Sequence, residues 1–324
     1  MKDAKINLLI PPLLVIVMFF WGGSFIAIKV GLDYLTPLEL VFARFLPSAL
    51  ILSPLGLIIY YRQDPQFKIL RNLGWKNYLT LLLASFFAVP SYHFSLNYGE
   101  TLIPAGWASL VISLNPACIT IFAAFILRER VSMRTWLGLV ISLGGLVFIS
   151  ITSTNITLEN PLDNGGDPLQ SLLGIAITLM AVVSWGGFVV LSKKLMTSLP
   201  PLTVLGITMA VGTLMMVPVA SRDFGEKCLM GDFDFWGSVV FLSIGCTVIS
   251  FIIWFWVLNK WRASRAGMFI YLVPLFAVLM GYFYLNEPIT HTLWIGAIIV
   301  LGGVILAGRS TETKLEQDVI RDDT

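Results

Sequence analysis

Three ionisable side chains stand inside long apolar stretches of this sequence, where a charge is costly unless it has a partner or a function. Arg44 and Glu39 lie five residues apart in one stretch, and His93 lies in another. A buried guanidinium either binds the carboxylate of a small solute or satisfies carbonyl groups at nearby helix ends, and the sequence leaves both uses of Arg44 open. Glu39 and His93 are the candidates for binding a proton, although a lone histidine is more often a packing residue.

Two tryptophans, Trp21 and Trp185, each precede a pair of glycines near the middle of an apolar stretch. Their rings could line a cavity, and the glycines would let helices approach closely or leave carbonyl groups free; helix packing through glycine is the alternative. Pro116 and Pro274 each remove a backbone hydrogen bond and predict breaks in two further helices. The predicted ligand-binding residues are Trp21, Ser24, Arg44, His93, Asn97, Trp107, Asn115, Trp185, Asn259 and Tyr271, and the predicted hinge or gating residues are Gly22, Gly23, Pro116, Gly186, Gly187 and Pro274.

The sequence offers no constellation for catalysis or metal binding. A zinc protease of the HExxH type needs paired histidines, and His93 and His291 are too far apart. A serine hydrolase needs a GxSxG turn, and Ser24 follows two glycines without one. The three cysteines have no CxxC spacing, so neither a disulfide framework nor a zinc site is supported. We therefore expect no enzyme, no catalytic residue, no metal and no cofactor.

The composition indicates a protein surrounded by lipid. Hydrophobic residues make up 57% of the 324 residues and charged residues only 12%, with a further 27 glycines. A soluble domain carries roughly 25% charged residues, so the missing polar surface must face a membrane. The net charge of +2 comes without a long basic cluster, which argues against nucleic acid as a partner. Membrane lipid and a small-molecule substrate are the expected partners.

Apolar runs long enough to cross a bilayer recur along almost the whole chain. Each needs about 20 residues. We predict an all-α polytopic membrane protein with ten transmembrane helices, at about residues 9–31, 37–61, 78–98, 102–127, 134–153, 170–192, 201–220, 236–259, 265–285 and 291–308.

The distribution of basic residues predicts the orientation of these helices. With ten spans the two termini share one side, and that side collects 17 of the 21 Lys and Arg residues. The acidic, glycine-rich segment 159–167 falls on the other side and contains no basic residue. Because cytoplasmic loops are enriched in Lys and Arg, we expect a multi-pass protein, most simply of a bacterial plasma (inner) membrane, with both termini in the cytoplasm.

The two halves of the chain repeat one another. Trp21-Gly22-Gly23 recurs as Trp185-Gly186-Gly187 at a separation of 164 residues. A later block recurs at a separation of 158 residues, with eight identities that include Pro116 and Pro274. Each half has five spans, and because five is odd the halves must cross the bilayer in opposite senses. Such inverted repeats are common in secondary transporters.

Several motifs add a family resemblance. The first half contains WGGSF at 21–25, Arg44, AGWAS at 105–109 before Asn115-Pro116, RER at 128–130 and a glycine pair at 144–145, and the second half contains Pro274, NEP at 286–288 and a glycine pair at 302–303. These motifs resemble the EamA repeat of the drug/metabolite transporter superfamily, over about residues 12–308. The resemblance implies an EamA-like repeat in residues 1–155 and another in 170–310, with 156–169 as an external linker and 311–324 as a cytoplasmic tail.

The resemblance implies a secondary transporter of small metabolites, most simply an exporter of amino acids or similar amphipathic solutes, that works by alternating access. It leaves the substrate open. At the separation of 164 residues Arg44 falls on Thr208 and Glu39 on Thr203, so the second half lacks the charged pair of the first. Only Glu39 is expected to enter the hydrocarbon as a carboxylate, which favours facilitated transport over proton coupling through Glu39 or His93.

Other readings remain open at this point. One is a flippase-like carrier of a lipid-linked or nucleotide-type metabolite. Another is a membrane scaffold or receptor that transports nothing. The sequence also leaves open whether the protein is a monomer or a homodimer.

Overall fold

The computed structural model describes residues 2–103, 108, 111–152, 168–219, 221, 223–285 and 291–309. Every regular element within these ranges is helical, in agreement with the predicted fold class. The elements in chain order are α1 (Lys2–Leu32), α2 (Pro37–Gln63), α3 (Lys68–Arg71), α4 (Trp75–Phe86), η1 (Phe87–Ser91), α5 (Tyr92–Leu102), α7 (Asn115–Ile126), α8 (Met133–Thr152), α9 (Pro168–Leu195), α10 (Pro201–Leu214), η2 (Val217–Val219), α11 (Phe224–Leu229), α12 (Phe233–Val240), η3 (Phe241–Ile249), α13 (Ser250–Lys260), α14 (Ala263–Gly267), η4 (Met268–Leu272), α15 (Val273–Leu285) and α16 (His291–Arg309).

Each of the ten predicted spans overlaps helical segments of the described chain, although the span predicted at 102–127 includes residues outside it. Five continuous helical segments there are long and apolar enough to cross a membrane: Leu8–Leu32, Pro37–Gln63, Trp75–Leu102, Leu172–Leu195 and Phe233–Lys260. The third of these runs four residues past the predicted end at 98, because the helix continues through Gly99 to Leu102. This extension brings Glu100 into a spanning helix, where the sequence had led us to expect no carboxylate other than Glu39.

The outward faces of these helices are apolar. Leu50 on α2, Phe125 on α7 and Ile298 on α16 are 68%, 82% and 69% exposed. Small hydroxyl side chains face the interior instead and bond to backbone carbonyls, as Ser48 does to Ser243 O at 3.1 Å. Apolar surface outside and satisfied polar groups inside is the arrangement that a lipid solvent requires.

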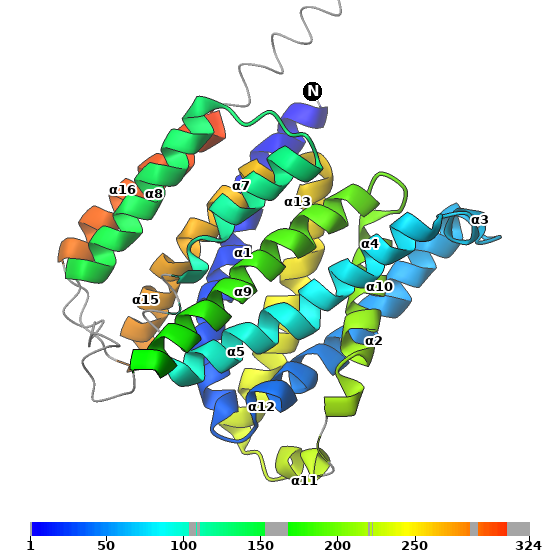
Figure 1. The fold of residues 1–324 in the computed structure, drawn as a ribbon, viewed down its shortest axis with the longest axis horizontal. Helices are drawn as coiled ribbons and strands as arrows, with labels where there is room; N and C mark the ends of the chain where they lie inside the picture. Colours follow the sequence, from blue (N-terminus) through cyan, green and yellow to red (C-terminus); the bar gives the residue numbers. More distant parts are fainter. Residues whose placement is uncertain are drawn as a thin grey trace, which may run out of the picture.

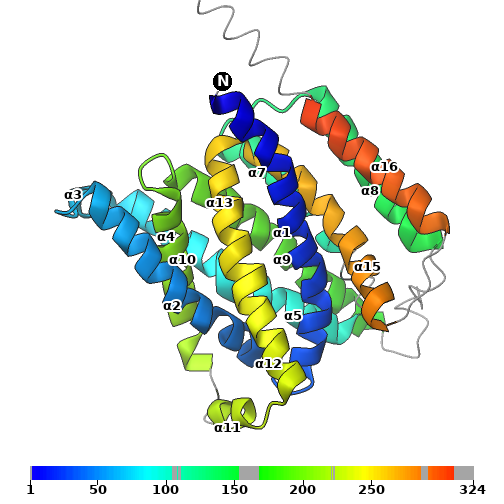
Figure 2. The same ribbon diagram turned by 180° about the vertical axis from the view of Figure 1, so that it is seen from behind.

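The packing of the helices is the same when the two halves are exchanged (Figures 1 and 2). Helix α2 packs on its counterpart α10, and α8 packs on its counterpart α16 at one edge of the bundle. Helix α1 contacts α15 and α13, while its counterpart α9 contacts α7 and α5. Since α15 corresponds to α7 and α13 to α5 in the sequence repeat, the two halves are related by an approximate twofold axis.

The glycine pairs show the same symmetry at atomic detail. A Cβ on Gly22 would lie 2.6 Å from Cβ of Phe276 on α15, and a Cβ on Gly186 would lie 2.7 Å from Sγ of Cys118 on α7. Phe276 and Cys118 are separated by 158 residues, which is the separation of the second repeat block. The glycines therefore allow close helix packing at equivalent places, and Gly23 and Gly187 likewise face the rings of Phe241 and Phe87.

Regular α-helix is interrupted at several places in both halves of the described chain. Pro116 and Pro274 each occupy the second residue of a new helix, α7 or α15, where the missing N–H costs little. Segments η1 and η3 are π-helical and lie between α4 and α5 and between α12 and α13. Because a π-helix leaves local hydrogen bonding irregular, η3 can supply groups that bond to other helices.

Candidate functional site

A cavity of about 50 Å³ lies at the centre of the bundle. Six of the ten predicted ligand-binding residues line it. That space holds a few water molecules, so an organic solute would enter only after the lining helices move apart. The lining residues are Trp21, Ser24, Phe25, Arg44, Tyr92, His93, Leu96, Ile112, Asn115, Trp185, Phe251, Ile270 and Val273.

Aromatic rings from both halves form one wall of this cavity. The rings of Trp21 and Trp185 meet edge to face with centroids 5.2 Å apart, and Trp254 lies 5.3 Å from Trp21. Trp21 is fixed by η3, because its Nε1 donates to Cys246 O at 3.0 Å. Trp185 Nε1 is buried and has no hydrogen-bond partner in the described part of the chain, although Tyr92 lies against its ring at 5.0 Å. One indole donor is thus already used and the other is available to a ligand or water.

Arg44 is the charged group of the cavity. Its side chain is 6% exposed, its Nε donates to Oγ1 of Thr247 on η3 at 2.9 Å, and its guanidinium lies 5.2 Å from the ring centroid of Phe45. Within the described residues the only ion pairs are those of Lys227, so no carboxylate neutralises Arg44. A buried cation that lines a cavity without a protein counter-ion creates a site for an anionic group.

Three neutral polar side chains, two of which line the cavity, keep unused acceptor or ring atoms. His93, Asn97 and Asn115 are each at most 3% exposed. In the described chain His93 Nε2, Asn97 Oδ1 and Asn115 Oδ1 have no hydrogen-bond partner, which is costly unless water or a ligand supplies one. The amide of Asn97 donates to Pro37 O at 3.2 Å, and the ring of His93 packs on Phe45 with centroids 4.6 Å apart.

Three further predicted residues, Asn97, Asn259 and Tyr271, are not among the residues that line the cavity. Tyr271 is buried beside Leu139, and its hydroxyl donates to Leu139 O at 3.4 Å. Asn259 is exposed near the end of α13 and belongs to a separate surface groove that contains Trp256. Trp107 lies outside the described residues. The binding roles of these four residues stay predictions, and no described contact with the cavity supports those of Tyr271 and Asn259.

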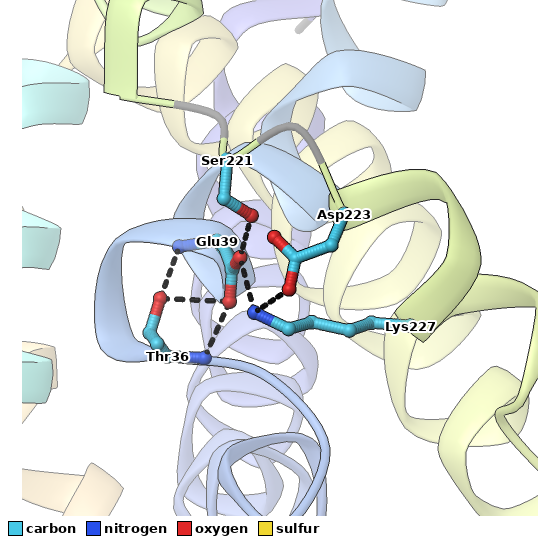
Figure 3. Close-up of polar contacts among 5 residues, drawn as sticks. All are labelled: Thr36, Glu39, Ser221, Asp223 and Lys227. Atoms are coloured by element: carbon cyan, nitrogen blue, oxygen red, sulfur yellow. Dashed lines mark hydrogen bonds and ion pairs between the residues drawn. The ribbon is translucent and has the colours of Figure 1, made fainter.

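Glu39 is fully engaged at one end of the bundle, which we call the α11 end (Figure 3). It closes a capping box with Thr36 at the start of α2, accepting from Thr36 N at 2.9 Å and from its hydroxyl at 2.8 Å. Its other oxygen accepts from Ser221 and from Lys227 Nζ, the latter at 2.9 Å. Asp223 is 3.1 Å from the same Nζ. Glu39 therefore has a structural role in this conformation, and its predicted role in proton coupling stays a prediction.

Charged side chains also hold the opposite end, where α13 turns sharply into α14; we call it the α13–α14 end. The carboxylate of Glu129 accepts from the backbone N–H of Ala263 and Ser264 at 2.9 and 3.3 Å and from the Ser264 hydroxyl at 2.8 Å. Lys193 Nζ donates to Leu258 O at 2.8 Å and to Trp261 O. Arg128, with a left-handed φ of 56°, turns the chain after α7 so that Glu129 reaches α14.

Sequence reasoning missed two polar residues near the site. Tyr92 is not among the predicted residues, yet it lines the cavity and packs on Trp185. Glu100 falls outside the predicted span 78–98, yet its Oε1 is buried without a partner in the described chain. Spacing could have revealed Glu100, since positions 93, 97 and 100 share one helical face.

The comparisons with known proteins agree with this architecture. The model of the EamA-like transporter family matches residues 9–151 and again 172–309. The chain is 30% identical to an uncharacterized transporter of Archaeoglobus fulgidus, over 91% of this chain and 97% of that protein. It is 26% identical to a protein of Escherichia coli named a probable amino-acid metabolite efflux pump, over 91% and 93% of the two chains.

A solved crystal structure has the same fold, with a TM-score of 0.68, 19% identity, and coverage of 92% of this chain and 96% of that one. The two family matches fall on the two halves that the helix packing relates by its approximate twofold axis. The family consists of transporters and not of enzymes. The chain is an integral, multi-pass membrane protein and belongs to the EamA-like transporter family.

Proposed function

We propose that this transporter carries amino acids or similar small amphipathic solutes that bear a carboxylate, by alternating access around the central cavity. The main support for this proposal is Arg44, a buried guanidinium beside the tryptophan cluster with no carboxylate partner in the described residues. It would bind the substrate carboxylate, and the rings of Trp21 and Trp185 would cover the apolar part. The similarity to the E. coli protein named a probable amino-acid metabolite efflux pump supports this substrate class and favours export.

We also propose that both termini face the cytoplasm, so that the α11 end faces outward. The support is the sequence: the basic residues collect on the side of the termini. Export would then load the substrate from the α13–α14 end and release it at the α11 end.

The test of substrate class is counterflow in proteoliposomes with a panel of amino acids, amines and nucleobases. The most informative comparison of two test substrates is between an amino acid and the amine that lacks only its carboxylate, for example phenylalanine and phenethylamine. The wild-type protein should prefer the amino acid. Arg44→Gln should lose about 10–100-fold in apparent affinity for the amino acid, the value of a charged hydrogen bond, and should bind the amine unchanged.

Arg71→Gln, an exposed change outside the spanning helices, is the matched control and should behave as wild type. Arg44→Lys, which keeps the charge, distinguishes loss of charge from loss of packing on Phe45. An unchanged preference in Arg44→Gln would overturn the role of Arg44. Counterflow of nucleobases alone would overturn the substrate class, and absence of any counterflow would favour a scaffold.

A further inference from the structure

One face of α5 carries a line of polar atoms that the described protein leaves without partners. His93, Asn97 and Glu100 stand at positions i, i+4 and i+7 of this helix. The buried atoms His93 Nε2, Asn97 Oδ1 and Glu100 Oε1 have no hydrogen-bond partner in the described chain. An unpaired buried polar atom is costly, and three on one helical face in a membrane protein indicate a path for water or ions.

This line runs from the central cavity toward the α11 end. His93 lines the cavity, and Asn97 lies one turn further on, with its amide on Pro37 O at the start of α2. Glu100 is a further turn along, about 10 Å from His93 at 1.5 Å per residue. Asn115 Oδ1, also without a partner in the described residues, extends the polar lining inside the cavity.

In the described structure, no basic side chain forms an ion pair with Glu100. In the described part of the chain, the elements packed most closely on α5 are α2, α9 and η1. Helix α2 brings Glu39, which is paired with Lys227, and Arg44, which is bonded to Thr247. On α5 itself the other titratable side chains are Tyr92, His93 and Tyr98, while η1 and residues 172–192 of α9 contain no acid or base. A carboxylate in such a place is neutralised by binding a proton.

We propose that Glu100 is the proton-binding site of this transporter and that the face formed by His93, Asn97 and Glu100 connects it with the central cavity. One proton from the solution at the α11 end binds the Glu100 carboxylate, and the same proton leaves that oxygen through water along the face of α5 when the cavity opens to the other side. Inward proton movement would then drive substrate outward. This proposal deepens the proposed transport function and rests on it.

The experiment imposes a pH gradient on proteoliposomes and compares wild type, Glu100→Gln and Glu226→Gln. Glu226 is an exposed glutamate on α11 at the same end, so it provides the same chemical change as a control. Wild type and Glu226→Gln should concentrate the amino acid against its gradient. Glu100→Gln should lose this accumulation and keep counterflow without a pH gradient, which also shows that it is folded. Glu100→Asp should restore part of the accumulation.

A second readout does not depend on knowing the substrate. Infrared difference spectra between acidic and neutral pH should show the band of a protonated buried carboxyl in wild type and Glu226→Gln, and its loss in Glu100→Gln. Accumulation by Glu100→Gln equal to wild type, or wild-type transport that ignores the pH gradient, would overturn the proposal. If no amino acid is transported at all, the proposed function fails, whereas the infrared band still decides whether Glu100 binds a proton.

Discussion

The two ends of the bundle are both held by ionised side chains, but through different partners. At the α13–α14 end, Glu129 and Lys193 bond to backbone groups at the start of α14 and the end of α13. At the α11 end, Glu39 on α2 pairs with another side chain, Lys227 on the short helix α11 (Figure 3). The first kind of contact fixes helix ends, and the second joins a helix to an external loop.

This difference predicts which end of the bundle should open more easily. Backbone groups at helix ends are already oriented, and each carries part of the helix dipole, so a charged partner gains interaction without ordering a second flexible side chain. Lys227 has a flexible stem and is 32% exposed, so that water and salt compete for its charge. We therefore expect the α11 end to open at lower cost than the α13–α14 end.

The largest expected effect comes from breaking the α13–α14 end with Glu129→Gln. The change removes the carboxylate that satisfies two N–H groups and one hydroxyl, which should cost about 1–3 kcal/mol, or about 2–8 °C in melting midpoint. Thermal unfolding in detergent measures the midpoint, and counterflow measures the accompanying loss of transport. The exposed change Glu226→Gln is the control. Equal melting midpoints for wild type and Glu129→Gln would remove the contrast between the ends.

A smaller effect is expected from breaking the α11 end with Lys227→Met. Because Lys227 is 32% exposed and Glu39 keeps its bonds to Thr36 and Ser221, we expect loss of this pair to cost about 1 kcal/mol or less, so that opening at this end increases by at most about fivefold. The native thiol of Cys228, half-buried on α11, reports it through its rate of labelling by a membrane-impermeant maleimide in intact cells. Labelling of wild type from outside also tests the proposed orientation, and Cys118→Ser in both proteins removes the other half-buried thiol.

Lys29→Met, an exposed change on α1 at the same end, is the matched control. High salt should raise the labelling rate of wild type toward that of Lys227→Met, because it screens the same pair. A labelling rate that neither salt nor Lys227→Met changes would show that this contact does not close the α11 end.

The smallest expected effect is that of moderate pH on the α11 end. Hydrogen bonds from Ser221 and then Lys227 lower the pKa of Asp223 from its usual 3.8, and hydrogen bonds to Glu39 and Asp223 raise the pKa of Lys227 from 10.5. The contribution of Asp223 is present above pH 3.8 and is lost as pH falls through its lowered pKa. That of Lys227 is present below pH 10.5 and is lost as pH rises through its raised pKa.

Neither Asp223 nor Lys227 should therefore change its ionisation between about pH 5 and 8. The rate of Cys228 labelling, corrected for the ionisation of the thiol itself, should then stay constant over this interval. If the labelling rate changes inside this interval and Glu100→Gln abolishes the change, the titrating group is Glu100. If Lys227→Met abolishes it, the ion pair of Lys227 titrates where we expect it to stay ionised. The measurement thus separates closure of the α11 end from proton binding on α5.

Much of the fold could be predicted because its causes are local and additive. The apolar runs, the basic loops and the spacing of 164 and 158 residues between repeats are all visible in the chain, and they predict ten spans in two related halves. The meeting of Trp21 with Trp185 follows the repeat symmetry. The predicted helix ended too early because Glu100, read alone, marks a membrane boundary, whereas the helix continues to Leu102 and Glu100 Oε1 is buried.

Partners in space could not be predicted. Arg44 bonds to Thr247, which is 203 residues away, and Glu39 bonds to Lys227, which is 188 residues away; nothing in the spacing of these residues indicates either contact. Tyr271 and Asn259 had suitable chemistry and suitable helices, yet one packs beside α8 and the other lies at the surface. The direction in which a side chain points depends on helix rotation, which packing against several neighbours decides.

The sequence by itself determined that this chain crosses a membrane as two related halves, since hydropathy and internal similarity act residue by residue along the chain. Only the tertiary structure decided which polar groups are already satisfied and which are not. Glu39 is saturated by partners at the α11 end, while Arg44 has no carboxylate partner and Glu100 Oε1 has no hydrogen-bond partner in the described structure. The physical reason is that desolvation and pairing depend on the whole surroundings of a group in space, and chain neighbours supply only a small part of them.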